Sequence, residues 1–464
     1  MSQKQTEELI NHPIIRNLAR LFDAAGFELY LVGGSVRDAL LGRESDDFDF
    51  ATSATPEQTL AVVRGFADDI WQIGMDFGTI GLAKARSKLE ITTFREERYL
   101  EESRHPEVSF AAAIETDLSR RDFTINAMAI KLPEGAFIDP FGGLTDLASN
   151  RLRTPISPVQ SFTDDPLRIL RAFRFTAMLG MKPDNGTVEA IIKYGQRLEI
   201  VSRERVRDEL SKLLTSPAPG RAIVGMVNTG LAAHFLPELA EMARLRDPAN
   251  RHKDVLKHTV MVVDNVEATL VLRLAALLHD VGKSKTKTEG PDGIHFFHHE
   301  VVGAKMARKR LKALRFPTKT IDEITALIES HMRFHTYRLG WSDKAVRKYV
   351  REIGPGRLPG LGKLVRADCT TQNDLLAKKY GRLLDELEKR IDKLEAAEES
   401  AKIRPPLDGN EIMEFLELKP GPKVGKVLNM LLEARLDDRI RTKQEAYEMT
   451  RAWAKKHLDT NPKP

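Results

Sequence analysis

The segment Leu31–Thr52, with the sequence LVGGSVRDALLGRESDDFDFAT, decides how the first part of the chain folds. The mostly apolar run Phe27–Val32 predicts a strand that ends at the glycine pair 33–34. A second strand-like run carries Asp47 and Asp49, and strand residues two apart point to the same face. We therefore expect two carboxylates to converge beside a Gly-Gly turn whose backbone N–H groups a phosphate can approach.

A cation is expected at this point, because two converging carboxylates repel each other unless a positive charge lies between them. Mg²⁺ fits best, since it takes oxygen ligands and commonly shares them with substrate phosphates. Glu90, in the run LEITTFR, is a third candidate ligand because it faces away from its apolar neighbours Leu89 and Ile91, and three carboxylates can hold two metal ions. Each feature alone has a simpler interpretation, as a solvated strand end or a surface glutamate.

Length and composition limit the class of protein. A chain of 464 residues is expected to form roughly two to four domains. Its 42% hydrophobic and 30% charged residues are typical of a soluble globular protein. The sequence has neither an apolar run of the roughly 18 residues that span a membrane nor the apolar core of a signal peptide, and the single Cys369 suits a reducing cytoplasm. The net charge of +5 permits a polyanionic partner without demonstrating one.

The chain changes character along its length. Between residues 28 and 138 we expect strands and helices together, including strands at Thr79–Lys84 and Lys88–Phe94 and a helix over Pro56–Phe66. From Asp165 onward the spacing of apolar residues predicts helices almost throughout. The predicted fold class is therefore α+β, with a small mixed-sheet head followed by helical segments.

Arginines recur in two segments of the chain, at residues 120–121 and 168–174. Arg120 and Arg121 precede an apolar segment, and Arg168, Arg171 and Arg174 recur every three residues, so they would share one helix face. Their simplest interpretation is a solvated basic surface. Their functional interpretation is phosphate binding, for which arginine is suited, together with base recognition.

Asp165 lies one turn before Arg168, which permits a paired reading of a base edge. Aspartate accepts from an exocyclic amino group, and arginine donates to a ring nitrogen. Cytosine and adenine both present an amino donor beside a ring acceptor. One Asp–Arg pair could therefore accept C and A while rejecting U and G.

Six segments resemble, in order, the motifs of bacterial class II CCA-adding tRNA nucleotidyltransferases, a group that also contains bacterial poly(A) polymerases. They are residues 31–52, 88–95, 117–130, 137–147, 162–175 and 200–213. The matching residues are Gly33, Gly34, Arg37, Asp38, Asp47 and Asp49 in the first motif, Arg120 to Ala129 in the second, Asp139, Gly142, Gly143 and Asp146 in a flexible motif, Asp164, Asp165 and Arg168 in the base-reading motif, and Glu204, Arg207, Glu209 and Lys212 in the last. Asp164 stands where the family commonly has glutamate, which leaves the reading pair intact.

The resemblance implies a polymerase β-like nucleotidyltransferase head, a helical neck, an HD-type domain and a helical tRNA-binding tail. Their expected bounds are residues 1–150, 151–245, 246–375 and 376–464. It also implies that a tRNA 3′-OH attacks the α-phosphate of CTP or ATP and that pyrophosphate leaves. In this scheme Asp47, Asp49 and Glu90 hold the metals, Asp165 and Arg168 select the base, and the contacts to triphosphate and ribose are Gly34, Arg37, Arg121, Arg171 and Arg174.

A second metal site is predicted in the helical part, where His279 and Asp280 end the apolar run in LAALLHDVGKSK. The order H…HD…H…H…D resembles HD-superfamily phosphohydrolases and offers six ligands for one or two divalent ions such as Mn²⁺, Ni²⁺ or Co²⁺. The six residues are His258, His279, Asp280, His299, His331 and Asp368. The resemblance implies phosphatase and 2′,3′-cyclic phosphodiesterase activity. An HD domain retained mainly for structure is the alternative.

The expected function is addition of C, C and A to tRNA in the cytoplasm, with tRNA, CTP and ATP as partners and with no membrane or obligate protein partner. The C-terminal segment Leu407–Ile440 is expected to present a helix N-terminus to the tRNA backbone, or else to form a turn between two packed helices. A poly(A) polymerase or A-adding enzyme of the same group is the close alternative. An HD phosphohydrolase whose head only binds RNA is disfavoured by the intact set of Asp47, Asp49 and Glu90.

Overall fold

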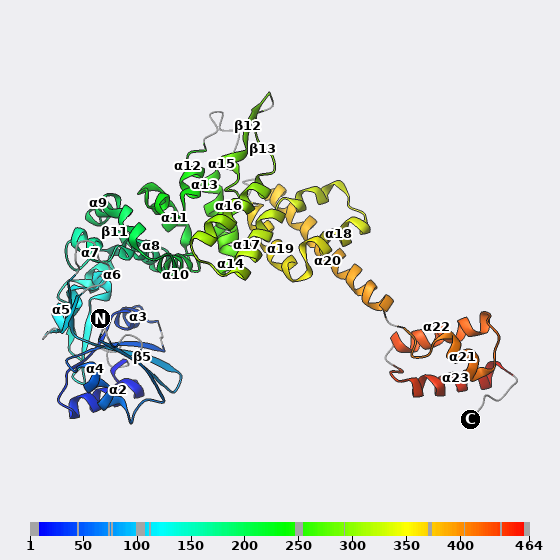
Figure 1. The fold of residues 1–464 in the computed structure, drawn as a ribbon, viewed down its shortest axis with the longest axis horizontal. Helices are drawn as coiled ribbons and strands as arrows, with labels where there is room; N and C mark the ends of the chain where they lie inside the picture. Colours follow the sequence, from blue (N-terminus) through cyan, green and yellow to red (C-terminus); the bar gives the residue numbers. More distant parts are fainter. Residues whose placement is uncertain are drawn as a thin grey trace. The chain divides into compact units, whose positions relative to one another are not determined.

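The computed structural model describes residues 9–43, 46–72, 75, 78–98, 107–110, 113–245, 254–291, 293–369, 374–402, 404–436 and 439–458. The chain divides into two compact units. The first contains Met1–Met332 with Pro359–Thr370, and the second contains Arg333–Leu358 with Thr371–Pro464. Within the first unit the chain passes from a sheet with flanking helices into an array of helices (Figure 1).

The head is built on a seven-stranded sheet with the order β3-β4-β5-β2-β1-β8-β9. The pair β2–β5 is parallel and the other neighbours are antiparallel, so the sheet is mixed, which confirms the predicted fold class. The strands are β1 Leu29–Val32, β2 Asp47–Thr52, β3 Asp69–Trp71, β4 Thr79–Lys84, β5 Ser87–Thr93, β8 Ala129–Leu132 and β9 Phe137–Ile138, and a separate ribbon pairs β6 Arg95–Arg98 with β7 Glu107–Phe110.

The alternation of side chains along the strands sets which residues face the site. Phe48 and Phe50 of β2 are buried in the larger core cluster, which also contains Phe22 from the first long helix. Asp47 and Asp49 occupy the alternate positions and therefore point to the opposite face. The helices and 3₁₀ turn of the head are α2 Pro13–Ala24, α3 Gly34–Leu40, α4 Pro56–Val63, α5 Ile114–Ser119, η2 Thr124–Asn126 and α6 Gly143–Ala148.

The rest of the first unit is mainly helical. Its helices are α7 Pro158–Asp164, α8 Leu167–Leu179, α9 Asn185–Tyr194, η3 Gly195–Ile200, α10 Arg203–Leu214, α11 Pro219–Asn228, η4 Leu231–His234, α12 Pro237–Ala243, α13 Val255–Asn265, α14 Leu270–Leu278, α15 Lys283–Thr286, α16 His299–Ala313, α17 Thr318–Ser330 and α19 Leu358–Asp368. Two short ribbons were not predicted from the sequence: β10 Arg151–Leu152 with β11 Lys182–Pro183, and β12 Lys287–Gly290 with β13 Gly293–Phe296. The former strands are too short to show a period, and every residue of β12 is exposed.

The second unit has its own packed core. Leu407, Val427 and Leu431 belong to a hydrophobic cluster formed within its C-terminal helices. The helical elements of the unit are η5 Arg333–Leu339, α18 Asp343–Ile353, η6 Pro355–Arg357, α20 Asp374–Lys402, α21 Gly409–Leu416, α22 Pro422–Leu436 and α23 Lys443–His457. None of the helices in the described ranges is long and apolar enough to cross a membrane.

Candidate nucleotide pocket and second metal centre

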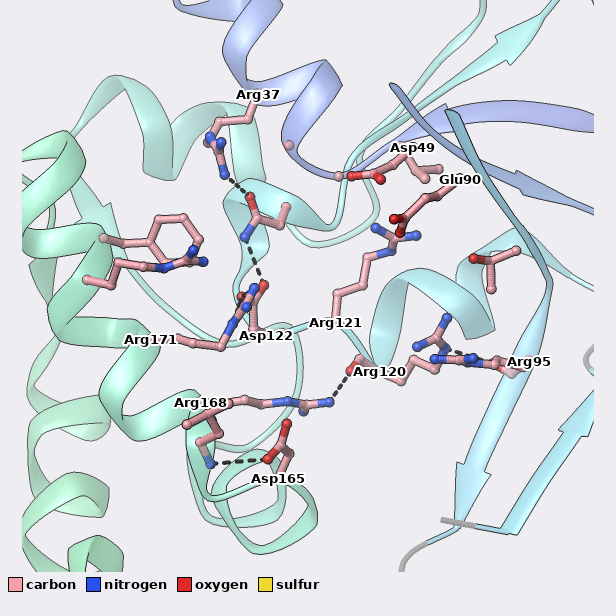
Figure 2. Close-up of a pocket in the computed structure, with 18 of the residues that line it drawn as sticks. Arg37, Asp49, Glu90, Arg95, Arg120, Arg121, Asp122, Asp165, Arg168 and Arg171 are labelled. Atoms are coloured by element: carbon pink, nitrogen blue, oxygen red, sulfur yellow. Dashed lines mark hydrogen bonds and ion pairs between the residues drawn. The ribbon is translucent and has the colours of Figure 1, made fainter. Parts of the chain in front are cut away.

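A pocket of about 920 Å³ opens where the head meets α8 and α10 of the neck (Figure 2). The structure brings to this pocket Asp49 and Glu90 as well as every residue predicted to bind nucleotide. The residues that line it are Val32, Gly33, Gly34, Arg37, Asp49, Phe50, Glu90, Thr92, Arg95, Arg120, Arg121, Asp122, Asn126, Asp165, Leu167, Arg168, Arg171, Arg174, Phe175 and Arg205.

The carboxylates are aligned by the parallel pairing of β2 and β5. Asp49 lies opposite Glu90, and Asp47, two residues earlier, lies opposite Lys88. Lys88 Nζ lies 2.6 Å from Glu90 Oε1, so an ammonium group partly neutralises this cluster. The side chains of three carboxylates and one lysine therefore occupy neighbouring positions on one face of the sheet.

The electrostatics of this cluster favour a bound cation. Burial raises the pKa of Asp49, and Glu90 and Asp47 raise it further against the opposing charge of Arg121. The ionised form of Asp49 is thus disfavoured by its surroundings, and a divalent ion with oxygen ligands would relieve this cost. The residues present therefore fit a divalent metal site.

The turn between β1 and α3 lets the backbone approach these side chains closely. Gly33 has φ +70, and a Cβ atom there would lie 2.8 Å from Arg121 Nη1 and 3.5 Å from Asp49 Oδ2. Ser35 ties the turn to β2, because its Oγ accepts from the Asp49 N–H at 3.0 Å and its hydroxyl donates to the Asp47 carbonyl at 3.3 Å. Glycine at position 33 is therefore favoured by the left-handed backbone conformation, and a side chain there would displace the end of Arg121.

Asp117 orients the arginine pair. Its carboxylate is fully buried and pairs with both Arg120 and Arg121, the latter at 3.0 Å from Nη2. Burial disfavours ionisation of Asp117, but the two guanidinium groups outweigh this effect and lower its pKa. The sequence signal for this arrangement is the i,i+3 and i,i+4 spacing in DLSRR on α5.

Asp122 connects the head with the neck. Its Oδ1 accepts from Asn126 Nδ2 at 2.8 Å and its Oδ2 accepts from Arg171 Nε at 2.8 Å. Asn126 Oδ1 in turn accepts from Arg37 Nη1 at 2.6 Å. Burial opposes ionisation, but Arg171 and the hydrogen bond from Asn126 lower the pKa of Asp122. The buried carboxylate of Asp122 therefore holds Arg171 of α8 directly and Arg37 of α3 through Asn126.

A second buried carboxylate holds α8 from the other side. Glu209 on α10 lies with its Oε2 at 3.0 Å from Arg174 Nε and its Oε1 at 3.5 Å from Arg171 Nη1. The guanidinium groups of Arg37, Arg171 and Arg174 lie 5.4, 5.8 and 4.8 Å from the centre of the Phe175 ring. The arginine stripe of α8 is therefore a supported wall of the pocket rather than a solvated face.

The predicted base-reading residues lie beside each other but have separate supports. Asp165 precedes α8, where its Oδ1 accepts from the Leu167 N–H at 3.1 Å and its Oδ2 accepts from Arg205 Nη2 at 3.1 Å. Arg168 donates from Nη1 to Ser161 Oγ at 3.0 Å and from Nη2 to the Arg120 carbonyl. Asp165 is thus at the entrance to the helix rather than within the helical stripe.

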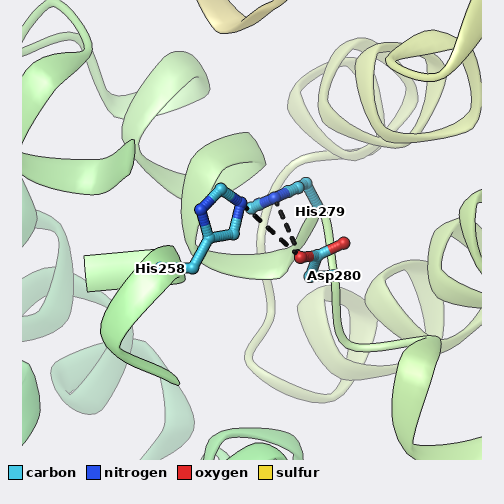
Figure 3. Close-up of side chains that lie close together, drawn as sticks. All are labelled: His258, His279 and Asp280. Carbon is cyan, nitrogen blue, oxygen red and sulfur yellow. Dashed lines mark ion pairs between the residues drawn. The ribbon is translucent and has the colours of Figure 1, made fainter. Parts of the chain in front are cut away.

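The six predicted HD ligands converge in the first unit, and Figure 3 shows three of them. Their nitrogen and oxygen atoms form two groups that share Asp280: one with His258 and His279, and one with His299 and His331. Asp368, from α19, reaches the same place, with its Oδ1 at 2.9 Å from His258 Nε2 and 3.4 Å from His279 Nε2.

The imidazole hydrogen bonds are those expected of metal ligands. The Nδ1 atoms of His279, His299 and His331 lie 2.8, 2.9 and 2.6 Å from backbone carbonyl oxygens. A carbonyl only accepts, so each Nδ1 carries the proton and Nε2 is the nitrogen with a free lone pair in the neutral ring. Nε2 of His279 and of His299 is buried without a hydrogen-bond partner among the described residues, as a metal-binding nitrogen would be.

The charges at this centre also fit a cation. Burial disfavours the imidazolium form of His279, but Asp280 and Asp368 outweigh it and raise the pKa of His279 to about 10. Burial and the adjacent His279 lower the pKa of His331 to about 4. The two carboxylates therefore favour a positive charge at His279, a position where a divalent metal would supply that charge instead.

Comparison with known proteins agrees with this architecture. Residues 29–153 match the family "Poly A polymerase head domain", residues 180–242 match "Probable RNA and SrmB- binding site of polymerase A", and residues 233–397 match "HD domain". The fold and the pocket are those of a metal-dependent nucleotidyltransferase with an appended HD domain.

Three similar proteins define the relationship further. An A-adding tRNA nucleotidyltransferase of Deinococcus radiodurans is 36% identical over 91% of this chain and 95% of its own. A CC-adding tRNA nucleotidyltransferase of Thermus thermophilus is 32% identical over 92% and 94% of the two chains. The crystal structure of the Bacillus stearothermophilus CCA-adding enzyme in complex with CTP superposes with a TM-score of 0.62 at 26% identity, covering 96% of this chain and 98% of that one. The chain therefore belongs to the tRNA nucleotidyltransferase family that includes the CCA-adding enzymes.

Several residues in or beside the pocket were given no role from the sequence. Ser35, Asp122, Asn126 and Arg205 lie within recognised motifs, but their tasks depend on partners far away in the chain. The spacing of residues within a motif carries no information on such pairings. The local signal for Asp117, by contrast, is visible in one helical turn.

Proposed function

We propose that this enzyme adds C, C and A in turn to the 3′ end of tRNA from CTP and ATP and releases pyrophosphate at each step. The observation that carries the proposal is that a single pocket is lined both by the carboxylates Asp49 and Glu90 and by Asp165 and Arg168, the pair predicted to read the base. The first pair suits phosphoryl chemistry and the second suits recognition of C and A.

Asp47, Asp49 and Glu90 are proposed to hold Mg²⁺, the ion that best fits oxygen ligands shared with phosphates. When bound, the metal would activate the tRNA hydroxyl and neutralise charge on the leaving pyrophosphate. A bond forms between the tRNA 3′-oxygen and the α-phosphorus, and the bond from the α-phosphorus to the pyrophosphate oxygen breaks.

The arginines are proposed to bind the triphosphate and ribose. The lining residues include eight arginines and four carboxylates, and this excess of positive charge suits a triphosphate. Gly34, Arg37, Arg121, Arg171 and Arg174 would make the contacts. Three buried carboxylates already hold arginines of this set: Asp117 pairs with Arg121, Asp122 with Arg171, and Glu209 with Arg174. Little reorganisation is therefore needed when the nucleotide binds.

A specific observation supports one alternative, which is addition of A alone. The Deinococcus radiodurans relative, which matches nearly the full length, is named an A-adding enzyme, and the Thermus thermophilus relative is named a CC-adding enzyme. Asp165 and Arg168 suit both C and A, which favours the complete CCA reaction.

The test offers two transcripts, one ending at the discriminator base and one ending in CC, with CTP and ATP singly and together. Ordered addition of C, C and A to the first transcript supports the proposal. Addition of A only to the CC-ended transcript identifies an A-adding enzyme, and addition that stops after CC identifies a CC-adding enzyme. Long A tracts on either transcript would identify a poly(A) polymerase.

For the second site we propose metal-dependent hydrolysis of a nucleotide phosphate ester, with Mn²⁺, Ni²⁺ or Co²⁺ held by His258, His279, Asp280, His299, His331 and Asp368. The buried Nε2 atoms of His279 and His299 support metal binding. Hydrolysis of 2′,3′-cyclic AMP is measured with each metal against a His279→Ala control. No release above this control with any metal would leave the site without this activity.

The proposed tail, residues 376–464, would contact the tRNA backbone through helix N-termini such as that of α22 at Pro422. Such contacts are electrostatic and should weaken with salt. The division into head, neck, HD-type domain and tail at residues 150, 245 and 375 is part of this proposal. Because its substrates would be tRNA, CTP and ATP, we place the reaction in the cytoplasm.

A further inference from the structure

The ion pair between Arg205 and Asp165 has no role in the scheme above. Arg205 lies on α10 and lines the nucleotide pocket, and its Nη2 donates to Asp165 Oδ2 at 3.1 Å. The other oxygen of Asp165 accepts from the Leu167 N–H at 3.1 Å. The position of the Asp165 carboxylate is therefore set from two directions, by the start of α8 and by the side chain of a different helix.

The chemistry of base reading makes this position decisive. Cytosine and adenine present an exocyclic amino donor beside a ring nitrogen acceptor, whereas uracil and guanine present a carbonyl acceptor beside a ring N–H donor. An aspartate facing the exocyclic group and an arginine facing the ring nitrogen accept C and A. The same two side chains with their places exchanged would accept U and G.

Selection of C and A therefore depends on where each group is held and not only on which groups are present. Arg168 is held on its own side by Ser161 Oγ and the Arg120 carbonyl. Asp165 is held on its side by Leu167 and Arg205. Of these supports, the Arg205 side chain is half-exposed and reaches across from α10, so it can be replaced without disturbing the start of α8.

We propose that Arg205 is a specificity-determining positioning residue, which keeps the Asp165 carboxylate facing the exocyclic group of the incoming base and thereby excludes U and G. The inference rests on the proposed function, because it assumes that Asp165 and Arg168 read the base. Arg205 acts through Asp165 and takes no part in the transfer step.

The test compares kcat/KM for CTP and UTP on a transcript that ends at the discriminator base, and for ATP and GTP on a transcript that ends in CC. Arg205→Ala is expected to lower the preference for CTP over UTP, and for ATP over GTP, by about tenfold, the scale of one misplaced base contact. The change should lie mainly in KM for the correct nucleotides, with tRNA binding and thermal unfolding unchanged. Arg205→Lys, which retains the charge, should restore part of the preference.

The matched control is Arg203→Ala, which removes the same charge from the same helix at a residue outside the pocket lining. A double variant, Asp165→Ala with Arg205→Ala, should discriminate no worse than Asp165→Ala alone, because Arg205 acts through Asp165. An unchanged preference in Arg205→Ala, or additive losses in the double variant, would overturn the inference. A wild-type enzyme that adds neither C nor A would overturn the proposed function itself.

Discussion

At the scale of single residues, the pocket is organised by buried carboxylates that are paired with its arginines. Asp117, Asp122 and Glu209 are each less than a tenth exposed, and each holds two cationic or amide groups. Such residues are costly to bury alone and stabilising only when paired, so the arginines and their carboxylates have to be treated as one unit.

Replacement of the proposed metal ligands should separate catalysis from binding. Asp49→Ala or Asp47→Ala should lower the rate of nucleotide incorporation by about a thousandfold or more, since the variant loses charge stabilisation worth several kcal/mol in the transition state. tRNA affinity, measured by filter binding, should stay within about twofold of wild type. Asp69→Asn, an exposed carboxylate on β3, serves as the control. Normal incorporation by either alanine variant would remove that residue from the metal site.

Asp117→Asn should destabilise the head, because it leaves Arg120 and Arg121 without their buried counter-charge. The expected loss is about 3 kcal/mol in the free energy of unfolding, the scale for removing one partner of a buried ion pair. Differential scanning calorimetry should show it as a lower temperature of the first transition. The control is Asp208→Asn at the exposed Asp208–Arg207 pair, where the expected change is below about 1 kcal/mol. Equal melting of the two variants would contradict the assignment.

At the scale of elements, local sequence patterns predicted individual helices and strands, because their caps and apolar spacing lie within a few neighbouring residues. The helix at Pro56 is capped by Thr55. The Thr55 side chain accepts from the Gln58 N–H, and the Gln58 side chain accepts from the Thr55 N–H. The strands at Thr79–Lys84 and near Lys88 and the helix α8 were also visible in the sequence. The pairing of Asp49 with Glu90 was not, because strand register depends on tertiary packing between β2 and β5.

The close contact between α15 and α16 depends on Gly282. Glycine is needed there for space and not for its backbone conformation. A Cβ atom at Gly282 would lie 2.1 Å from the His299 carbonyl oxygen and 2.6 Å from the Gly303 nitrogen. Gly282→Ala should therefore displace the start of α16, which carries the proposed ligand His299, and weaken Mn²⁺ binding by about tenfold or more in a calorimetric titration. Gly65→Ala, where nothing lies within 4 Å, should bind Mn²⁺ normally. Equal affinity in the two variants would show that α15 and α16 adjust without cost to the site.

At the scale of the whole molecule, the depressed pKa values of Asp117 and Asp122 predict a loss of stability in acid. A carboxyl group whose pKa is lower in the folded state stabilises the protein above its unfolded pKa, about 3.9, and this contribution is lost as the pH falls toward the folded pKa. The contribution of these two carboxylates to the melting temperature should therefore be nearly constant from pH 7 to about pH 5 and should be lost below about pH 4.

Asp122→Asn provides the comparison for this pH dependence. The variant should melt lower than wild type at pH 7, and its melting temperature should fall less steeply below about pH 4, because the group that gains a proton is gone. Parallel curves for the two proteins would show that Asp122 does not contribute to the acid transition. The difference between the two curves separates the contribution of Asp122 from those of the other carboxylates that gain protons in acid.

The two units are not continuous along the chain. Arg333–Leu358 belong to the second unit, and the chain returns to the first unit at Pro359–Thr370. Composition and the order of motifs do not predict that a segment of the chain leaves one unit and that the chain later returns to it. Gly360, for example, lies beside Leu327 and Leu272 of the first unit, and this proximity cannot be read from the sequence.

This return of the chain makes the HD centre a junction between distant segments. His331 is the last proposed ligand before the chain enters the second unit, and Asp368 is the first after it comes back. A single proteolytic nick within residues 333–358 would place Asp368 on a separate polypeptide from the five other proposed ligands. A metal held by all six would then add to the packing that keeps Pro359–Thr370 in the first unit, so a chelator should make the C-terminal fragment of a nicked enzyme easier to release while leaving the uncut chain whole.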